Sequence, residues 1–179
     1  IKIYGGFNGT ETDLSERDWI ANVTTLSGDI GTINNTSDNT YHVLWINYRT
    51  SAMVLDGFTV TKGNANGINE NSNGGGIYNK GDGPSNPSNP TIANCSFLAN
   101  AAHPSNGNGG AFFNNGVAGN ANPTFTTCSF KSNSAHNGGA FATLGIFGGK
   151  ARPVFTNCHL SSNTANYGGA MYNDGFFGD

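Results

Sequence analysis

One motif recurs three times in the chain, with the form Pro-x-apolar-x-x-Cys-x-apolar-x-x-Asn. A Gly-Gly-Ala segment follows each copy, and the cysteines of successive copies stand 33 and 30 residues apart. A period of about 30 residues is typical of a solenoid, in which each turn of the chain buries its apolar face against the next turn. The copies occupy residues 90–100, 123–133 and 153–163.

The repeat predicts an all-β parallel β-helix with about 30 residues in each turn, or coil, and three strands per coil. In the first copy, Ile92 lies three residues before the cysteine and Phe97 lies two after it. Side chains alternate along a strand, so both residues point inward only if the chain bends between them, at 93–94, 126–127 and 156–157. The residue after each Gly-Gly-Ala is apolar, and we expect it to point inward. The second glycine of each pair is expected to leave room for that side chain.

Residues that share one position in every copy are expected to stack on one another along the solenoid. Neighbouring strands lie about 4.8 Å apart, which is further than the roughly 3.8 Å between the Cβ atoms of a disulfide. We therefore predict free, buried cysteines that act as small apolar side chains. The asparagines at the end of each copy are predicted to bond to one another as a polar ladder. The two ladders contain Cys95, Cys128 and Cys158, and Asn100, Asn133 and Asn163.

The first 40 residues differ from the regular coils. We expect residues 1–40 to form an N-terminal cap and a first irregular coil, and residues 41–179 to form the coils of the β-helix. Apolar runs and alternations predict strands at 1–7, 24–30, 41–46 and 53–61. A short helical turn is expected within 14–19. The chain begins inside an apolar alternation and stops soon after a Gly-Gly-Ala strand, so we expect a fragment of a longer chain.

Composition and charge exclude several kinds of function. Charged residues make up only 11% of the chain and the net charge is −3, which argues against nucleic-acid binding. No apolar run approaches the roughly 18 residues of a transmembrane helix, so no membrane span is expected. No Cys-x-x-Cys pair or histidine cluster accompanies the cysteines, so neither a metal nor another cofactor is expected.

Carboxylates are the catalytic groups expected of a polysaccharide lyase or glycosidase on a β-helix. None occurs between Asp82 and Asp174, which argues against such a site on the regular coils. Asp29 and Asp56 are the best candidates for an acidic pair, although each stands beside a glycine where turn chemistry explains it better. No catalytic residue is predicted. The sequence favours a non-enzymatic protein and leaves an enzyme open.

Aromatic residues suggest a different kind of site. Tyr78, Phe113 and Tyr172 each follow an inward apolar residue, so alternation predicts that they point outward. A row of outward aromatic rings could stack against sugar rings. Ala142 interrupts this row. A mild positive excess from Lys131, Lys150 and Arg152 would favour an anionic glycan.

The repeats resemble those of chlamydial polymorphic outer-membrane proteins, whose hallmark pair is Phe-x-x-Asn and Gly-Gly-Ala/Ile. The segments Phe97-Leu-Ala-Asn100 and Phe130-Lys-Ser-Asn133 match the first element, and the third copy has Leu160 in place of phenylalanine. The segments 3–7, 17–19, 26–29 and 55–63 are similar to parts of large secreted β-helix proteins of Bacteroidetes-like bacteria. The resemblance implies a right-handed parallel β-helix that is secreted or lies on a bacterial cell surface, often in adhesion.

Three functions remain open at this point. The first is a non-enzymatic extracellular or cell-surface segment that contacts glycans, or proteins of host or neighbouring cells, as an adhesin does. The second is the scaffold of a polysaccharide lyase or hydrolase whose catalytic residues lie outside this sequence. The third is a structural stalk or filament subunit that self-associates through its coil ends.

Overall fold

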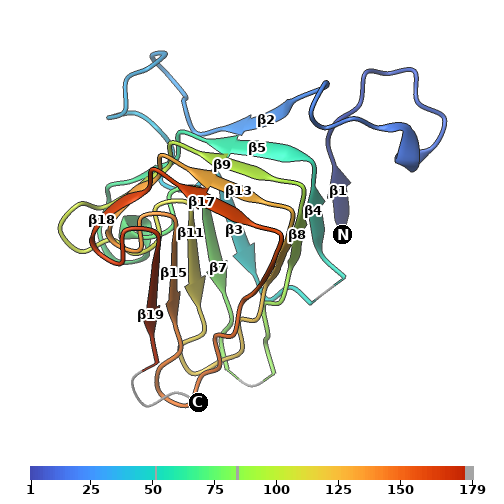
Figure 1. Ribbon diagram of the computed structural model, residues 1–179. Helices are drawn as coiled ribbons and strands as arrows, with labels where there is room; N and C mark the ends of the chain where they lie inside the picture. Colours follow the sequence, from blue (N-terminus) through green and yellow to red (C-terminus); the bar gives the residue numbers. More distant parts are fainter. Residues whose placement is uncertain (51, 84, 176–179) are drawn as a thin grey trace.

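The chain forms a parallel β-solenoid of about five turns, with about 33 residues per turn. The computed structural model describes residues 1–50, 52–83 and 85–175, so the last four residues of the predicted 41–179 region lie outside the described part. The strands stack in parallel sheets around one core, and the N-terminal segments lie at the top of the stack (Figure 1). The described residues contain no α-helix and no helix long and apolar enough to cross a membrane.

Four sheets form the walls, and we name them A to D. Sheet A contains β1 (Lys2–Tyr4), β4 (Val54–Asp56), β8 (Thr91–Ala93), β12 (Thr124–Thr126) and β16 (Val154–Thr156). Sheet B contains β2 (Thr24–Ser27), β5 (Phe58–Thr61), β9 (Ser96–Leu98), β13 (Ser129–Lys131) and β17 (His159–Ser161). Sheet C contains β3 (Leu44–Asn47), β7 (Ile77–Lys80), β11 (Phe112–Asn115), β15 (Phe141–Leu144) and β19 (Met171–Asp174). Sheet D contains β6 (Asn64–Ala65), β10 (Ala101–Ala102), β14 (Ser134–Asn137) and β18 (Thr164–Tyr167).

The parallel solenoid is confirmed, but the prediction of three strands per coil is wrong because sheet D adds a fourth. Its strands are only two to four residues long and lie where the sequence suggested a corner and a loop. Each contributes one small inward side chain, an alanine, to the interior. That alanine stands two residues after the corner asparagine or glycine and is the only sequence signal of this sheet. The alanines are Ala65, Ala102, Ala135 and Ala165.

The core is a set of apolar columns that run along the solenoid axis. Phe97 and Phe130 stack with their ring centroids 4.7 Å apart, and Phe125 and Phe155 stack at 4.8 Å. These distances match the spacing of neighbouring parallel strands, so each ring rests on the equivalent ring of the next coil. Edge contacts, such as that between Phe112 and Phe125 at 4.9 Å, join one column to another.

The predicted bend between sheets A and B is confirmed. Asn94, Thr127 and Asn157 adopt left-handed backbone conformations with φ of 50°, 53° and 53°. In the preceding coil Gly57 takes this place with φ of 81°, and it divides the predicted strand 53–61 into β4 and β5. A left-handed residue reverses the side-chain alternation, which explains why inward residues stand five positions apart across it.

The glycine pairs have a different role from the one expected. The first glycine of the pair has a positive φ, as in Gly109 with 62°. A Cβ atom on the second, Gly110, would lie 2.3 Å from the carbonyl oxygen of Ser134 and 2.4 Å from that of Gly139. Backbone of the next coil therefore requires the glycine, and the expected room for an aromatic ring is not the reason.

The asparagine ladder is confirmed. The Oδ1 atom of Asn133 accepts hydrogen bonds from the backbone N–H of Asn100 at 2.9 Å and from its side-chain amide at 3.2 Å. The amide of Asn133 donates to Oδ1 of Asn163 at 3.0 Å. The sequence did not reveal two further ladders. One joins Asn73, Asn108 and Asn137, and the other joins Asn79, Asn114 and Thr143.

The cysteine ladder is also confirmed. All three thiols are free, Cys95 and Cys128 are buried in the core, and Cys158 is partly buried. Burial raises the pKa of Cys95 to about 11, and burial likewise raises the pKa of Cys128. The thiolate is the reactive form of cysteine, so these two thiols are inert at neutral pH.

The N-terminal region is joined to the solenoid by sheet pairing. Strand β1 pairs with β4, and β2 pairs with β5, so residues 1–40 supply edge strands to sheets A and B. The predicted helical turn is present as a 3-10 helix, η1 (Leu14–Glu16). It lies in a polar excursion over residues 7–23, which we call the N-terminal arm (Figure 1).

Candidate functional site

The aromatic residues predicted to form an outward row are stacked on the outer side of sheet C. Their register places Tyr78 beside Phe113, followed by Ala142 and Tyr172 in the next two coils. Trp45, which the sequence reasoning missed, continues the row in the other direction and stacks on Tyr78 with the ring centroids 4.5 Å apart. The predicted row is therefore present on sheet C. Side-chain alternation along β3 could have predicted that Trp45 also belongs to it.

The middle of this row is covered. Tyr78 is 1% exposed and Phe113 is 3% exposed, so neither ring is available to a ligand. The second 3-10 helix, η2 (Asn69–Ser72), lies over β7, where Glu70 accepts a hydrogen bond from Lys80 at 2.7 Å. The expectation that Tyr78 and Phe113 stack against sugars therefore fails on accessibility.

His42 packs against two aromatic rings of this row. Its ring lies edge-on to Trp45 and Tyr78, with centroids 5.1 and 5.4 Å away. Its Nδ1 atom lies 3.0 Å from the carbonyl oxygen of Gly74 and serves as the donor, since a carbonyl only accepts. Burial lowers the pKa of His42, which keeps the imidazole neutral.

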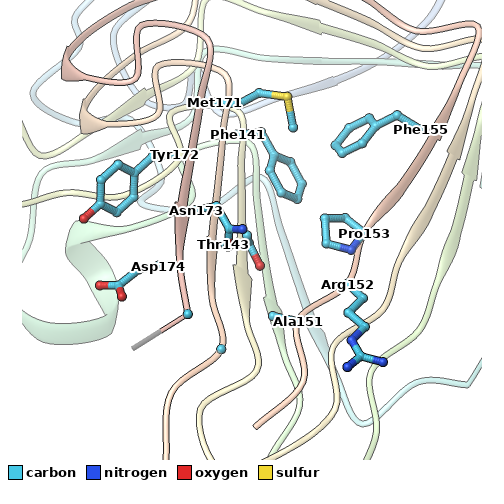
Figure 2. A pocket seen from close by; sticks show the side chains of 12 residues that line it. Phe141, Thr143, Ala151, Arg152, Pro153, Phe155, Met171, Tyr172, Asn173 and Asp174 are labelled. Carbon is cyan, nitrogen blue, oxygen red and sulfur yellow. The ribbon is translucent and has the colours of Figure 1, made fainter. Parts of the chain in front are cut away.

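Tyr172 is the one predicted aromatic residue that remains partly accessible. It belongs to the rim of a cavity of about 540 Å³ at the last described coil. In Figure 2 the side chains of Phe141, Phe155 and Met171 face one another across this cavity, while Tyr172 projects from β19 away from them. The cavity lies beside the apolar side chains of the last described coil.

The two candidate carboxylates each have a separate partner. Asp29 forms an ion pair with Lys62 at 2.5 Å, and the hydrogen bond from that ammonium group lowers the pKa of Asp29. Asp56 forms an ion pair with Arg17 at 2.5 Å and accepts a hydrogen bond from Asn94 at 2.9 Å. Each carboxylate therefore joins segments that lie far apart in the chain.

A second hollow lies on the outer face of sheet B, and we call it the sheet B groove. Its volume is about 480 Å³. One wall is the apolar end of the N-terminal arm, which consists of Trp19, Ile20 and Val23. The floor is a row of polar side chains in register across four coils, with the left-handed corner residues beside it. The row contains Thr59, Ser96, Ser129 and His159, and the corner contains Gly57, Asn94, Thr127 and Asn157.

Polar groups in the groove are free to bind a ligand. Within the described part of the chain, the side chains of Thr59, Thr127, Asn157 and His159 form no hydrogen bond. The hydroxyl of Ser129 donates to that of Ser96 at 3.1 Å. Among the described residues, no Asp, Glu, Lys or Arg side chain lines the groove.

The arm is held in place by Arg17. Its guanidinium group bonds to the carboxylate of Asp56 and to the carbonyl oxygen of Gly5 at 3.1 Å. It also lies 5.1 Å from the ring centroid of Trp19. The side chains of Arg17 and Asp56 are only 7% and 13% exposed, so this ion pair is largely screened from water. The groove wall is thereby fixed to the first coil.

The sequence reasoning missed the groove because its parts are far apart in the chain. His159 stands in register with Ser96 and Ser129, so the repeat itself does place the row of the floor on one face. The sequence reasoning had no means of placing the arm beside that row, since the arm has no repeat partner.

No family model, no curated protein and no solved structure matches the chain. Among the described residues there is also no group of three or more His, Cys, Asp or Glu side chains that could hold a metal ion.

Proposed function

We propose that this chain is a non-enzymatic scaffold at the cell exterior that contacts glycans through its outer surface, as an adhesin does. The observation that supports this most is the sheet B groove, which offers free hydroxyl, amide and imidazole groups beside an apolar wall. Ligand sites commonly combine apolar walls with a few polar groups. The resemblance of the repeats to bacterial surface proteins agrees with this proposal.

Two further observations favour a scaffold at the cell exterior. The segment 83–173 contains no carboxylate, and Asp29 and Asp56 are neutralised by Lys62 and Arg17. A buried thiol with a raised pKa, such as that of Cys95, resists oxidation because the thiolate is scarce. The buried thiols of Cys95 and Cys128 are thus compatible with an oxidising exterior.

The proposal is tested by measuring whether the protein binds a polysaccharide without cleaving it. The protein is incubated with a panel of neutral and acidic polysaccharides, and both retention on the polysaccharide and the release of new reducing or unsaturated ends are measured. We expect retention of the protein and no released product. Product formation would show the enzyme alternative to be correct, and failure to bind any glycan would refute glycan contact.

Self-association through the coil ends is a second candidate. Met171 points from β19 into the open end of the core and is 45% exposed, and no described strand pairs beyond β16–β19. An uncovered sheet edge can pair with another chain. Sedimentation over a range of protein concentrations tests this. Fibres or oligomers that Met171→Lys abolishes would support it, and a monomer at every concentration would exclude it.

A further inference from the structure

We propose that the sheet B groove binds a neutral glycan chain laid across the coils, between Trp19 and the row from Thr59 to His159. This inference rests on the proposed function, because it names the ligand class and the place on the same scaffold. It also replaces the anionic glycan that the positive excess of the C-terminal coils suggested.

The lack of charged side chains among the described residues of the groove favours a neutral ligand. Sites that recognise carboxylate or sulfate groups use Arg or Lys side chains, which bind them through charge-assisted hydrogen bonds. The described residues that line the groove include no such side chain. Lys131 belongs to β13 but does not line the groove, and Lys150 and Arg152 are likewise absent from its lining. An anionic chain would lose hydration there without gaining a cation as partner.

The hydrogen-bonding groups suit sugar hydroxyls. Hydroxyl and amide groups each offer both donors and acceptors, as a sugar hydroxyl does, and the imidazole of His159 adds a further polar group. The row Thr59, Ser96, Ser129 and His159 repeats at the spacing of parallel strands, about 4.8 Å. Such a regular array presents similar groups to successive parts of an extended chain.

The apolar wall suits the carbon-bound face of a sugar ring. Trp19 is partly buried, and Arg17 lies against it, so its ring has a fixed position. Ile20 and Val23 are 80% and 61% exposed, which leaves an apolar surface uncovered beside the polar row. Aromatic side chains contribute large apolar contacts with little loss of conformational freedom.

An extended peptide fits this surface less well. Peptides that bind to sheets usually add a strand at a sheet edge, where unpaired backbone groups supply most of the hydrogen bonds. The groove lies on the face of sheet B, and the backbones of β5, β9 and β13 there are already paired with their neighbours on both sides. Only side chains remain available, which favours a ligand rich in hydroxyls.

The experiment compares neutral oligosaccharides of glucose, mannose and galactose with oligogalacturonate by calorimetry, in low salt and in about 1 M salt, where the Debye length is only about 3 Å. We expect a neutral oligosaccharide to bind with less than about a twofold change in affinity between the two salt concentrations. Ser129→Lys fills the groove and should weaken binding at least about tenfold. Ser161→Lys places the same side chain on sheet B outside the groove and should have no effect.

A second pair of variants tests the wall. Trp19→Ala should weaken neutral-glycan binding about tenfold, whereas Tyr167→Ala removes an exposed aromatic residue of sheet D and should not. Salt-sensitive binding of oligogalacturonate alone would overturn the neutral assignment but leave glycan contact standing. Equal binding by Ser129→Lys and the parent protein would overturn the location. Binding of peptides and of no glycan would overturn both proposals.

Discussion

Asn133 occupies the centre of the corner ladder and satisfies groups in three successive coils. Its side-chain oxygen Oδ1 accepts a hydrogen bond from the backbone N–H of Asn100, and its side-chain amide donates to the backbone carbonyl oxygen of Phe97 at 3.0 Å. Both Asn100 and Asn133 are 1% exposed, so water cannot replace a lost partner. Polar groups at this corner therefore carry structural specificity as well as stability.

We expect Asn133→Ala to lower the free energy of unfolding by about 2–4 kcal/mol, because it leaves the buried N–H of Asn100 and the carbonyl of Phe97 unpaired. Urea denaturation followed by circular dichroism measures the change. Asn106→Ala, in an exposed loop, is the matched control and should change the stability by less than about 0.5 kcal/mol. Equal effects of the two substitutions would contradict a structural ladder.

The cysteines should differ in reactivity although they share one repeat position. Cys158 lies in the last described coil and is partly buried, whereas Cys95 and Cys128 are 2% exposed. We predict that a thiol reagent at pH 8 modifies Cys158 first in the folded protein, and modifies the other two only after denaturation. Mass spectrometry of the labelled peptides tests this. Rapid labelling of Cys95 or Cys128 under native conditions would disprove the buried ladder.

At the level of elements, the ion pair of Arg17 with Asp56 joins the N-terminal arm to the first coil, and the backbone N–H of Asp18 adds a hydrogen bond to the carbonyl oxygen of Gly6 at 2.9 Å. Removing one partner of a largely buried ion pair leaves an uncompensated charge, which costs about 3–5 kcal/mol. We expect Arg17→Ala to release the arm and make residues 7–23 sensitive to proteases, with the coils intact. Lys80→Ala is the control, because the side chains of Lys80 and its partner Glu70 are 28% and 47% exposed, so their ion pair should contribute less than about 1 kcal/mol. An arm that resists proteases in Arg17→Ala would show that other contacts hold it.

The arm should also respond to acid before the coils do. Hydrogen bonds from backbone or serine groups lower the pKa of four arm carboxylates, in Glu11, Asp13, Glu16 and Asp18, below the ordinary values of 4.5 for Glu and 3.8 for Asp. These hydrogen bonds join residues of the arm to one another, so a depressed folded-state pKa stabilises the folded conformation of the arm at pH values above the ordinary pKa. That stabilisation is lost as the pH falls through the folded-state pKa values.

Hydrogen exchange at pH 7 and pH 3, corrected for the intrinsic exchange rate, measures this response. We expect residues 7–23 to lose protection at pH 3, while the segment 90–163, which has no carboxylate, keeps it. Loss of protection in the coils before the arm would contradict the assignment.

At the scale of the whole molecule, the parts of the fold that repeat were predictable from the sequence. The period, the core positions, the corner at Asn94 and the ladder at Asn100 each occur at fixed places in the copies, so stacking follows from geometry. Sheet D was missed because one alanine per strand, such as Ala102, is too weak a signal for a buried strand. The coverage of Tyr78 by η2 and the groove beside Trp19 depend on segments that do not repeat, so their contacts are tertiary and leave no periodic trace.

The whole molecule is thus a rigid scaffold whose repeated positions build the interior and whose non-repeated segments shape the surface. Stability of this kind of fold is a sum of coil and interface contributions, and a ligand that spans four coils would join several of them. The groove floor draws on β5, β9, β13 and β17, so a ligand laid along it would contact four coils.

The most direct test of this account is hydrogen exchange measured with and without a saturating neutral oligosaccharide that the protein binds. We expect added protection at the five segments that line the sheet B groove, which are 19–23, 57–59, 94–96, 127–129 and 157–159, and none around Tyr172. Protection around Tyr172 and the open coil end, with no change in the groove, would contradict it.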